Sequence, residues 1–136
     1  PIRPAEPDFL KLMQALQRAE NYKTHFLVPV KGDKLLPLAV KSVSYFYITE
    51  GIVKAVTTQG KEYVLNQTLD ELTECLNPQF FFRANRQYLI AREAVKDITL
   101  WFNNRLIVNL HTSTPEKIII SKNRVGELKE WLMRNG

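Results

Sequence analysis

The chain has 136 residues, of which 45% are hydrophobic and 10% aromatic, and it carries a formal net charge of +5. This composition excludes a disordered chain and predicts one globular domain that is large enough to bury a core. No apolar run approaches the roughly 18 residues needed to cross a bilayer, so we expect no membrane partner.

The first 24 residues are expected to form an interdomain linker that carries a linker helix, and residues 25–136 the domain itself. The proline spacing of residues 1–7 is typical of a linker, and this segment lacks the apolar core of a secretory signal. Apolar side chains then recur at helical spacing behind an N-cap residue, which predicts a helix over residues 8–20: Asp8, Phe9, Leu12, Met13 and Leu16. We expect its apolar stripe to pack on its own domain, with a second copy of the chain as the alternative.

From His25 onward the hydrophobic period becomes that of β-strands. The Gly-Asp pair within Lys31–Lys34 suits a two-residue hairpin loop, and Pro29 and Pro37 push the flanking strands toward a sheet edge. Further turns at Glu50-Gly51 and Gln59-Gly60 predict an antiparallel meander. The strands expected in this half cover residues 26–30, 35–40, 44–49, 52–58 and 62–65.

A short helix is expected after the meander. Thr68 and Glu71 have the spacing of a capping box, and Asn77-Pro78 ends the helix. Cys75 lies on it as the only cysteine, which excludes an intramolecular disulfide and fits a reducing cytoplasm. Because no basic residue or histidine adjoins it in sequence, we expect an inert core thiol.

The last third of the chain is predicted to hold three strands and a final helix. Strands over residues 95–102 and 105–110 are joined by Asn103-Asn104, since asparagine tolerates positive φ. A short apolar strand follows over residues 117–120. Ser121 is then expected to cap a helix whose apolar face comprises Val125, Leu128, Trp131 and Leu132.

The residues of an active site cannot be assembled from this sequence. His25 and His111 lie in separate segments without metal-ligand spacing to a carboxylate or to Cys75. Glycine-rich phosphate loops, nucleophile elbows and paired carboxylate motifs are also missing. We therefore expect no enzyme, no catalytic residue, no metal and no cofactor.

Basic and amide side chains instead gather at predicted strand ends and loops. The central stretch is Phe80–Ile90, in which three aromatic residues lead into polar side chains without an acidic residue. Arginine, asparagine and glutamine can make paired contacts with base edges, and arginine also binds phosphate. A solvated turn between two strands is the alternative for this stretch alone. The full set of candidates is Arg83, Asn85, Arg86, Gln87, Lys122, Asn123, Arg124, Asn104, Arg105 and Lys54.

The charge distribution favours a polyanionic partner. Residues 77–136 contain ten basic and five acidic side chains, so the whole net charge of +5 lies in the last 60 residues. A one-sided basic half is what nucleic-acid-binding domains show.

From about His25 to Leu132 the sequence resembles a LytTR DNA-binding domain, the output module of a class of bacterial response regulators. The resemblance rests on five segments: Lys31–Lys34, Val43–Tyr47, Thr68–Leu72, Phe80–Ile90 and Ile120–Lys122. The family usually has histidine, serine and asparagine where this chain has Asn85, Gln87 and Ala91, and a Ser-Arg pair at Ser121-Lys122. The turn at Glu50–Ile52 is also shorter than is usual.

This resemblance implies a mainly β fold of about ten mostly antiparallel strands in small sheets, with short helices including the N-terminal linker helix and a C-terminal helix. It implies that loops enter successive major grooves of double-stranded DNA, with Arg86 at the base-contacting position and a second contact group after Ser121. It also implies an N-terminal receiver domain in a longer chain. We expect the isolated domain to be monomeric, with a possible homodimer on DNA.

Three hypotheses follow. The first is a cytoplasmic, sequence-specific DNA-binding output domain of a bacterial two-component response regulator that controls transcription. The alternative is a protein-interaction module whose basic half binds an acidic partner. A third, RNA binding, would need exposed aromatic side chains on a sheet at Tyr45, Tyr47 or Phe81.

Overall fold

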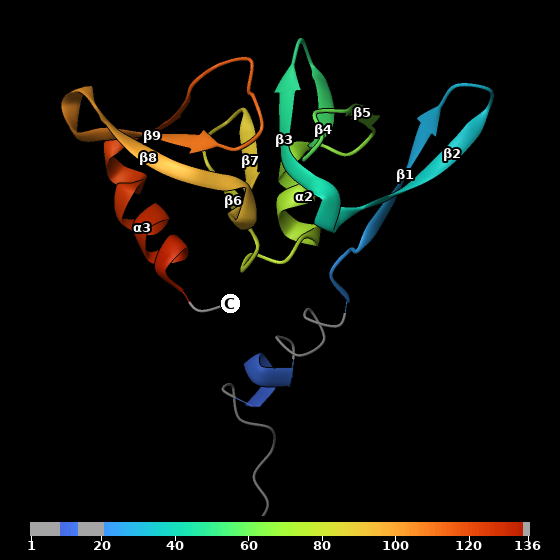
Figure 1. Ribbon diagram of the computed structural model, residues 1–136. Coiled ribbons are helices and arrows are strands. Elements are labelled where there is room, and N and C mark those ends of the chain that lie inside the picture. Colours follow the sequence, from blue (N-terminus) through green and yellow to red (C-terminus); the bar gives the residue numbers. More distant parts are fainter. Residues whose placement is uncertain (1–8, 14–20, 135–136) are drawn as a thin grey trace, which may run out of the picture.

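The computed structural model describes residues 9–13 and 21–134. Residues 9–13 are helical with exposed side chains. The other residues of the predicted helix over residues 8–20 lie outside the described residues, and so do residues 1–8 of the predicted linker. The elements that follow (Figure 1) are β1 (His25–Val30), β2 (Lys34–Ala39), β3 (Val43–Thr49), β4 (Ile52–Thr57), β5 (Glu62–Leu65), α2 (Leu69–Cys75), β6 (Phe81–Arg83), β7 (Tyr88–Ala91), β8 (Val95–Trp101), β9 (Arg105–Leu110), β10 (Ile118–Ile120) and α3 (Val125–Met133). The mainly β fold class and ten strands are confirmed in this part of the chain.

The strands form three small antiparallel sheets. The order is β5-β4-β3-β7-β6 in the five-stranded sheet, β10-β9-β8 in the three-stranded sheet, and β1-β2 in the hairpin. Figure 1 shows the five-stranded sheet, green to yellow, between the hairpin on one side and the orange three-stranded sheet on the other.

The five-stranded sheet contributes to two separate hydrophobic cores. Neighbouring residues of β3 point to opposite faces, so Phe46 belongs to one core and Tyr45 to the other. The first core is closed by β1, β2 and α2, and the second by the three-stranded sheet and α3. Burial on both faces explains the nearly continuous apolar run of β3.

The predicted turns form where residues tolerate positive φ. Glu50 and Gly51 have φ of 51° and 78°, and Asn103 and Asn104 have φ of 57° and 60°. The first hairpin loop differs from the prediction, since Val30 pairs with Lys34 and the loop has three residues instead of two.

The register of the first hairpin explains that longer loop. Val28 pairs with Leu36, and both side chains contact the same core. A shift by one residue would turn one of these side chains away from the core, so the buried face decides the register and the loop length follows from it.

Helix α2 begins with the predicted capping box. The Thr68 hydroxyl oxygen accepts from the Glu71 amide at 3.0 Å, and the Glu71 carboxylate accepts from the Thr68 amide at 2.9 Å. Leu69 and Leu72 are buried beneath the five-stranded sheet. This packing places Asp70, in the first turn, opposite β6.

The start of the last helix is not where the sequence predicted it. Ser121 makes no side-chain cap bond; a 3₁₀ turn over Lys122–Arg124 follows it, and α3 begins only at Val125. The Ser121 carbonyl instead accepts from the Arg124 amide at 2.9 Å. The predicted apolar face is confirmed by Leu128 and Trp131, which are 0% and 4% exposed.

Candidate nucleic-acid interface

The loop between β6 and β7, residues 84–87, is shaped by the side chain of Asn85. Its Oδ1 accepts from the amides of Gln87 and Tyr88 at 2.9 and 3.0 Å. Its Nδ2 donates to the carbonyl of Ile119 in β10 at 3.1 Å. One amide group therefore closes the turn and fastens it to the three-stranded sheet.

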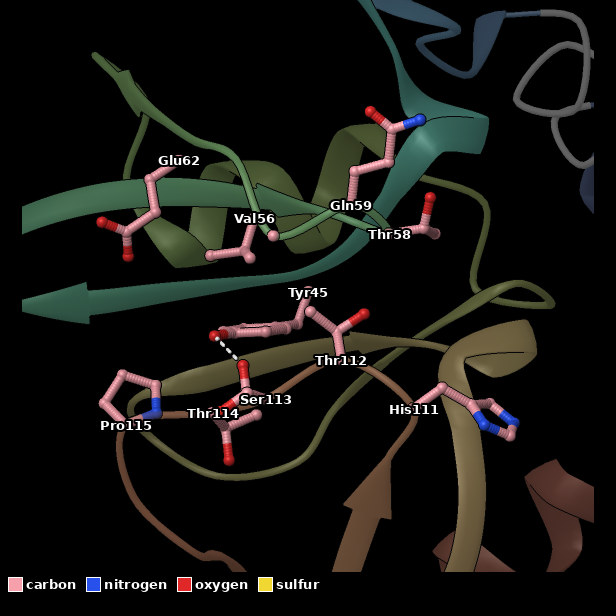
Figure 2. A pocket seen from close by; sticks show the side chains of 11 residues that line it. Tyr45, Val56, Thr58, Gln59, Glu62, His111, Thr112, Ser113, Thr114 and Pro115 are labelled. Atoms are coloured by element: carbon pink, nitrogen blue, oxygen red, sulfur yellow. Dashed lines mark hydrogen bonds between the residues drawn. The ribbon is translucent and has the colours of Figure 1, made fainter.

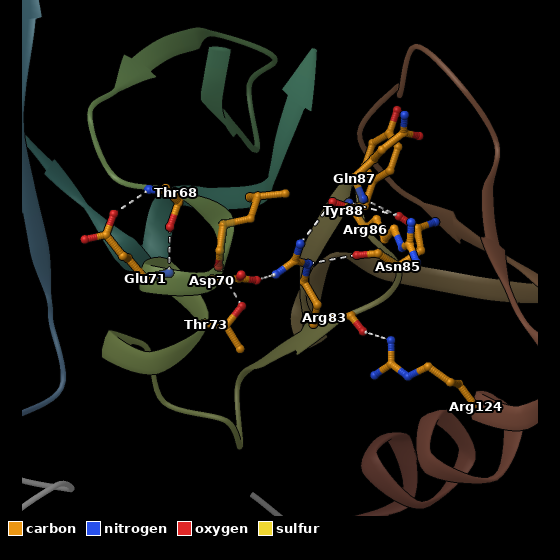
Figure 3. Close-up of polar contacts among 11 residues, drawn as sticks. Thr68, Asp70, Glu71, Thr73, Arg83, Asn85, Arg86, Gln87, Tyr88 and Arg124 are labelled. Carbon is orange, nitrogen blue, oxygen red and sulfur yellow. Dashed lines mark hydrogen bonds and ion pairs between the residues drawn. The ribbon is translucent and has the colours of Figure 1, made fainter. Parts of the chain in front are cut away.

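Arg83, at the end of β6, stabilises the same loop through hydrogen bonds. Its Nε donates to the carbonyl of Asn85 at 2.8 Å, and its Nη2 donates to the carbonyl of Arg86 at 2.9 Å. Its Nη1 donates to Oδ1 of Asp70 at 2.7 Å. All three nitrogens of this guanidinium thus have partners within the protein (Figure 3).

Arg124 joins the loop to the turn before α3. Its Nη1 donates to the carbonyls of Arg83 and Ala84, and its Nη2 contacts the Glu127 carboxylate at 3.3 Å. Its guanidinium also lies 4.9 Å from the centre of the Phe82 ring. The two predicted groups, at 83–87 and 122–124, are therefore one connected structure.

Four of the candidate side chains point outward from this structure: Arg86, Gln87, Lys122 and Asn123. Among the described residues, no hydrogen bond or ion pair engages any of these four side chains. The donor groups of these four side chains face solvent and are available to bind a ligand.

A basic hollow of about 480 Å³ lies between the loop and the turn. The residues that line it include four arginines and no acidic side chain: Arg83, Ala84, Asn85, Arg86, Arg105, Ile119, Ser121 and Arg124. Arg105, from a different hairpin, thus lines the same hollow as Arg86. Such a concentration of positive charge suits a phosphate or another anion.

Asn104 and Lys54 lie apart from this hollow. Asn104 is exposed at the tip between β8 and β9, where its positive φ forms the turn. Lys54 lies within β4 and forms a 3.9 Å ion pair with Glu62, whose other oxygen accepts from the Tyr47 hydroxyl at 2.7 Å. Lys54 therefore already has an acidic partner.

Sequence reasoning missed the residues that hold the arginines. Asp70 lies between the two residues of the predicted capping box, and its carboxylate binds Arg83, 13 positions away. Phe82 was grouped with two other aromatic residues, although it alone lies against Arg124. Long-range contacts of this kind leave no spacing pattern in the sequence.

The three aromatic side chains that the RNA hypothesis required to be exposed are buried. Tyr45, Tyr47 and Phe81 are 2%, 6% and 8% exposed and belong to the two cores. Burial, with the hydrogen bond to Glu62, raises the pKa of Tyr47 to about 12. The RNA hypothesis, which required these rings to stack on bases, is wrong.

A second hollow, of about 530 Å³, lies between the β4–β5 turn and the β9–β10 loop (Figure 2). Its lining combines the hydroxyls of several threonines with Glu62 and His111, and the Tyr45 hydroxyl donates to the carbonyl of Ser113 at 3.0 Å. It contains no lysine or arginine, so it does not suit a polyanion.

Neither a metal-binding cluster nor a membrane-spanning helix occurs in the described part of the chain. In residues 9–13 and 21–134 no three His, Cys, Asp or Glu side chains gather to hold a metal ion. The Cys75 thiol is half-buried against the first core, and burial raises its pKa. No helix in these ranges is long and apolar enough to cross a membrane.

Comparisons with known proteins give a consistent result. A family model described as the LytTr DNA-binding domain matches residues 33–133. The chain is 26% identical over 105 residues to the sensory transduction protein LytT of Enterococcus faecalis, covering 77% of this chain and 43% of that protein. It is 26% identical over 103 residues to the transcriptional regulatory protein YpdB of Escherichia coli strain K12, covering 76% of this chain and 41% of that protein. The chain thus spans less than half the length of either relative.

A solved structure supports the fold. It is the LytTr DNA-binding domain of a response regulator from Bacillus cereus, with a TM-score of 0.68 and 14% sequence identity. The match covers 82% of this chain and 99% of that one.

Proposed function

Because this chain belongs to the LytTr DNA-binding domain family, we propose that it recognises specific sequences in double-stranded DNA. The contacts come from the β6–β7 loop and from the turn that precedes α3. Arg86 contacts a base edge, and Lys122 and Asn123 contact a neighbouring groove and its phosphates.

The observation that supports this assignment is the contrast between Arg86 and its neighbours. Arg86 extends into solvent from a loop whose backbone is fixed by the inward-facing side chains of Arg83, Asn85 and Arg124. An arginine on a rigid support can make a paired contact with guanine at a low entropic cost.

Arg83, Asn85 and Arg124 face inward, so we propose for them a role other than the DNA contact that their side-chain types suggested. The hydrogen-bonding groups of Arg83 are occupied by the loop and Asp70, and those of Asn85 by the loop and Ile119. Those of Arg124 are occupied by the carbonyls of Arg83 and Ala84 and by Glu127. We assign these three residues to positioning the loop. Gln87 and Arg105, beside Arg86, extend the contact surface toward the DNA backbone, and Asn104 and Lys54 are peripheral to it.

The domain is proposed to act as the output part of a longer bacterial response regulator that controls transcription in the cytoplasm. The relatives support this, since they are named as sensory transduction and transcriptional regulatory proteins and are more than twice the length of the matched region. In such a protein residues 1–24 would connect an N-terminal receiver to the domain at residues 25–136. Pairing of two copies would then depend on adjacent DNA sites or on the receiver.

Selection from random duplex DNA tests the proposal. The domain is incubated with the pool at moderate salt, and the bound duplexes are sequenced over several rounds. We expect an enriched motif. Salt-sensitive binding without a motif would contradict sequence-specific recognition, and stronger binding to an acidic protein than to any duplex would favour an interaction module.

A further inference from the structure

The outer face of the three-stranded sheet carries an aromatic and cationic cluster that lies outside the loops described above. Nζ of Lys117, just before β10, lies 4.5 Å from the centre of the Trp101 ring at the end of β8. The ring of Phe102, which is 69% exposed, lies 4.8 Å from that of Trp101.

The register shows where Trp101 and Lys117 meet. β9 is the middle strand of the sheet, so side chains from β8 and from the start of β10 contact each other only by crossing β9. Ile107 of β9 pairs with Thr99 on one side and Ile119 on the other. Its neighbours Leu106 and Val108 face the second core, so Ile107 faces the opposite, outer side.

The burial of Ile107 indicates that this outer face is covered. Ile107 is only 4% exposed although it belongs to neither core. We attribute this burial to the long side chains of Trp101 and Lys117, which contact each other across β9. The Trp101–Lys117 pair is therefore an ordered surface feature, with a flat apolar ring and an ammonium group held together.

This feature continues the candidate interface. Trp101 pairs in register with Arg105, and Arg105 lines the same basic hollow as Arg86. A strip defined by Arg105, Trp101 and Lys117 thus leads away from Arg86 across the sheet. Asp97 of β8 lies on the same face and pairs with Asn109, from whose side-chain amide its carboxylate accepts a hydrogen bond at 2.7 Å.

We propose that this strip binds the sugar–phosphate backbone of DNA immediately beside the recognised sequence. The inference rests on the proposed function, because it assumes that the β6–β7 loop already holds the duplex. Arg105 and Lys117 neutralise phosphates, and the indole ring packs against deoxyribose. None of these contacts depends on base identity, so the strip adds affinity for flanking DNA and no specificity.

The test compares three duplexes. One contains only the minimal sequence enriched by selection, and the other two extend it by one helical turn of arbitrary sequence, one on each side. Wild-type protein should bind one extended duplex several-fold more tightly than the minimal duplex. Lys117→Ala and Trp101→Ala should remove most of that gain and leave the affinity for the minimal duplex unchanged. On the extended duplex, Lys117→Ala should also lower the salt slope by about one.

A matched control and an optical probe accompany the titrations. Leu100→Ala changes an 82% exposed residue that alternates to the opposite face from Trp101, and it should leave the gain intact. Trp101 and Trp131 are the chain's two tryptophans, and Trp131 is 4% exposed. Acrylamide quenching therefore reports mainly on Trp101 and should fall when the extended duplex binds.

The outcomes separate the two proposals. If the wild-type protein enriches no sequence and binds no minimal duplex, the proposed function itself fails. If it binds the minimal duplex but gains nothing from either extension, or if quenching of Trp101 is unchanged, the strip does not bind DNA. Equal losses for Trp101→Ala on both duplexes would also overturn the inference.

Discussion

At the scale of single residues, Arg83 and Arg86 show how little residue type alone says about role. They lie three positions apart, yet the guanidinium of Arg83 faces two carbonyls and Asp70, whereas that of Arg86 faces solvent. Arg83 therefore fixes the loop, and Arg86 is the residue that the loop presents.

Replacing Arg83 by leucine should damage DNA binding through the loop and not through a lost DNA contact. The carbonyls of Asn85 and Arg86 lose their charged donor, so we expect a loss of about 1–3 kcal/mol in the free energy of unfolding. Urea unfolding and titration with a matched duplex measure the two effects.

Asp70→Asn is the control for this prediction. It weakens the ion pair with a largely exposed carboxylate and removes a negative charge from the first turn of α2, and each of these effects contributes about 0–1 kcal/mol. Its affinity for DNA should remain close to that of the wild-type protein. If Arg83→Leu lost DNA affinity with unchanged stability, Arg83 would have to contact DNA directly.

The raised pKa of Tyr47 predicts that the protein loses stability at alkaline pH. Its folded-state pKa is about 12, above the ordinary value of 10.0, so the folded protein holds the proton more tightly than the unfolded chain does. Its contribution is fully present below pH 10 and is lost as the pH rises from 10 to 12. Burial also raises the pKa values of Tyr45 and Tyr88, which adds to the same trend.

Urea unfolding at pH 8, 10 and 11 measures this effect. The midpoint should fall between pH 10 and pH 11, and it should fall less in Tyr47→Phe than in the wild-type protein. A midpoint that stays constant over that interval in both proteins would contradict the assignment.

At the scale of elements, features set by adjacent residues were predictable and features set by distant contacts were not. The capping box of α2 and the turns at Glu50-Gly51 and Asn103-Asn104 depend on local backbone chemistry, and they form as expected. The predicted start of α3 was wrong, because the side chain of Arg124 donates to carbonyls about 40 positions earlier in the chain. The inward orientation of Asn85 depends likewise on Ile119, 34 positions away.

Two glycines should respond in opposite ways to alanine. Gly51 has a φ of 78° in the β3–β4 turn, so Gly51→Ala forces a side chain into a left-handed conformation and should cost about 1 kcal/mol or more. Gly126 lies in the first turn of α3 with nothing within 4 Å of an added Cβ, and its φ is not positive. Gly126→Ala should stabilise the protein by about 0.5–1 kcal/mol.

Thermal unfolding of the two variants checks these signs, with the wild-type protein as the reference. A decreased melting temperature for Gly126→Ala would mean that α3 is held differently from what its backbone geometry indicates. An unchanged melting temperature for Gly51→Ala would mean that the turn relaxes without cost.

At the scale of the whole molecule, the five-stranded sheet is the support that brings the contact groups together. Its two faces bury separate cores, and the second core fixes the three-stranded sheet and α3 beside the β6–β7 loop. This arrangement places Arg86, Arg105 and the turn before α3 around one basic hollow. The sequence predicted the fold class and the segments that carry charge, but the assembly of these segments depends on sheet pairing across the chain.

The most direct test of the account compares Arg86→Ala with Lys122→Ala. Each variant is titrated with the selected duplex and with duplexes that differ from it by one base pair, at two salt concentrations. Arg86→Ala should cost about 1–3 kcal/mol on the selected duplex and lose discrimination at one position, because a paired base contact is removed. Lys122→Ala should weaken all duplexes alike and lower the salt slope by about one. Equal and small losses on every duplex for both variants would contradict base recognition by Arg86.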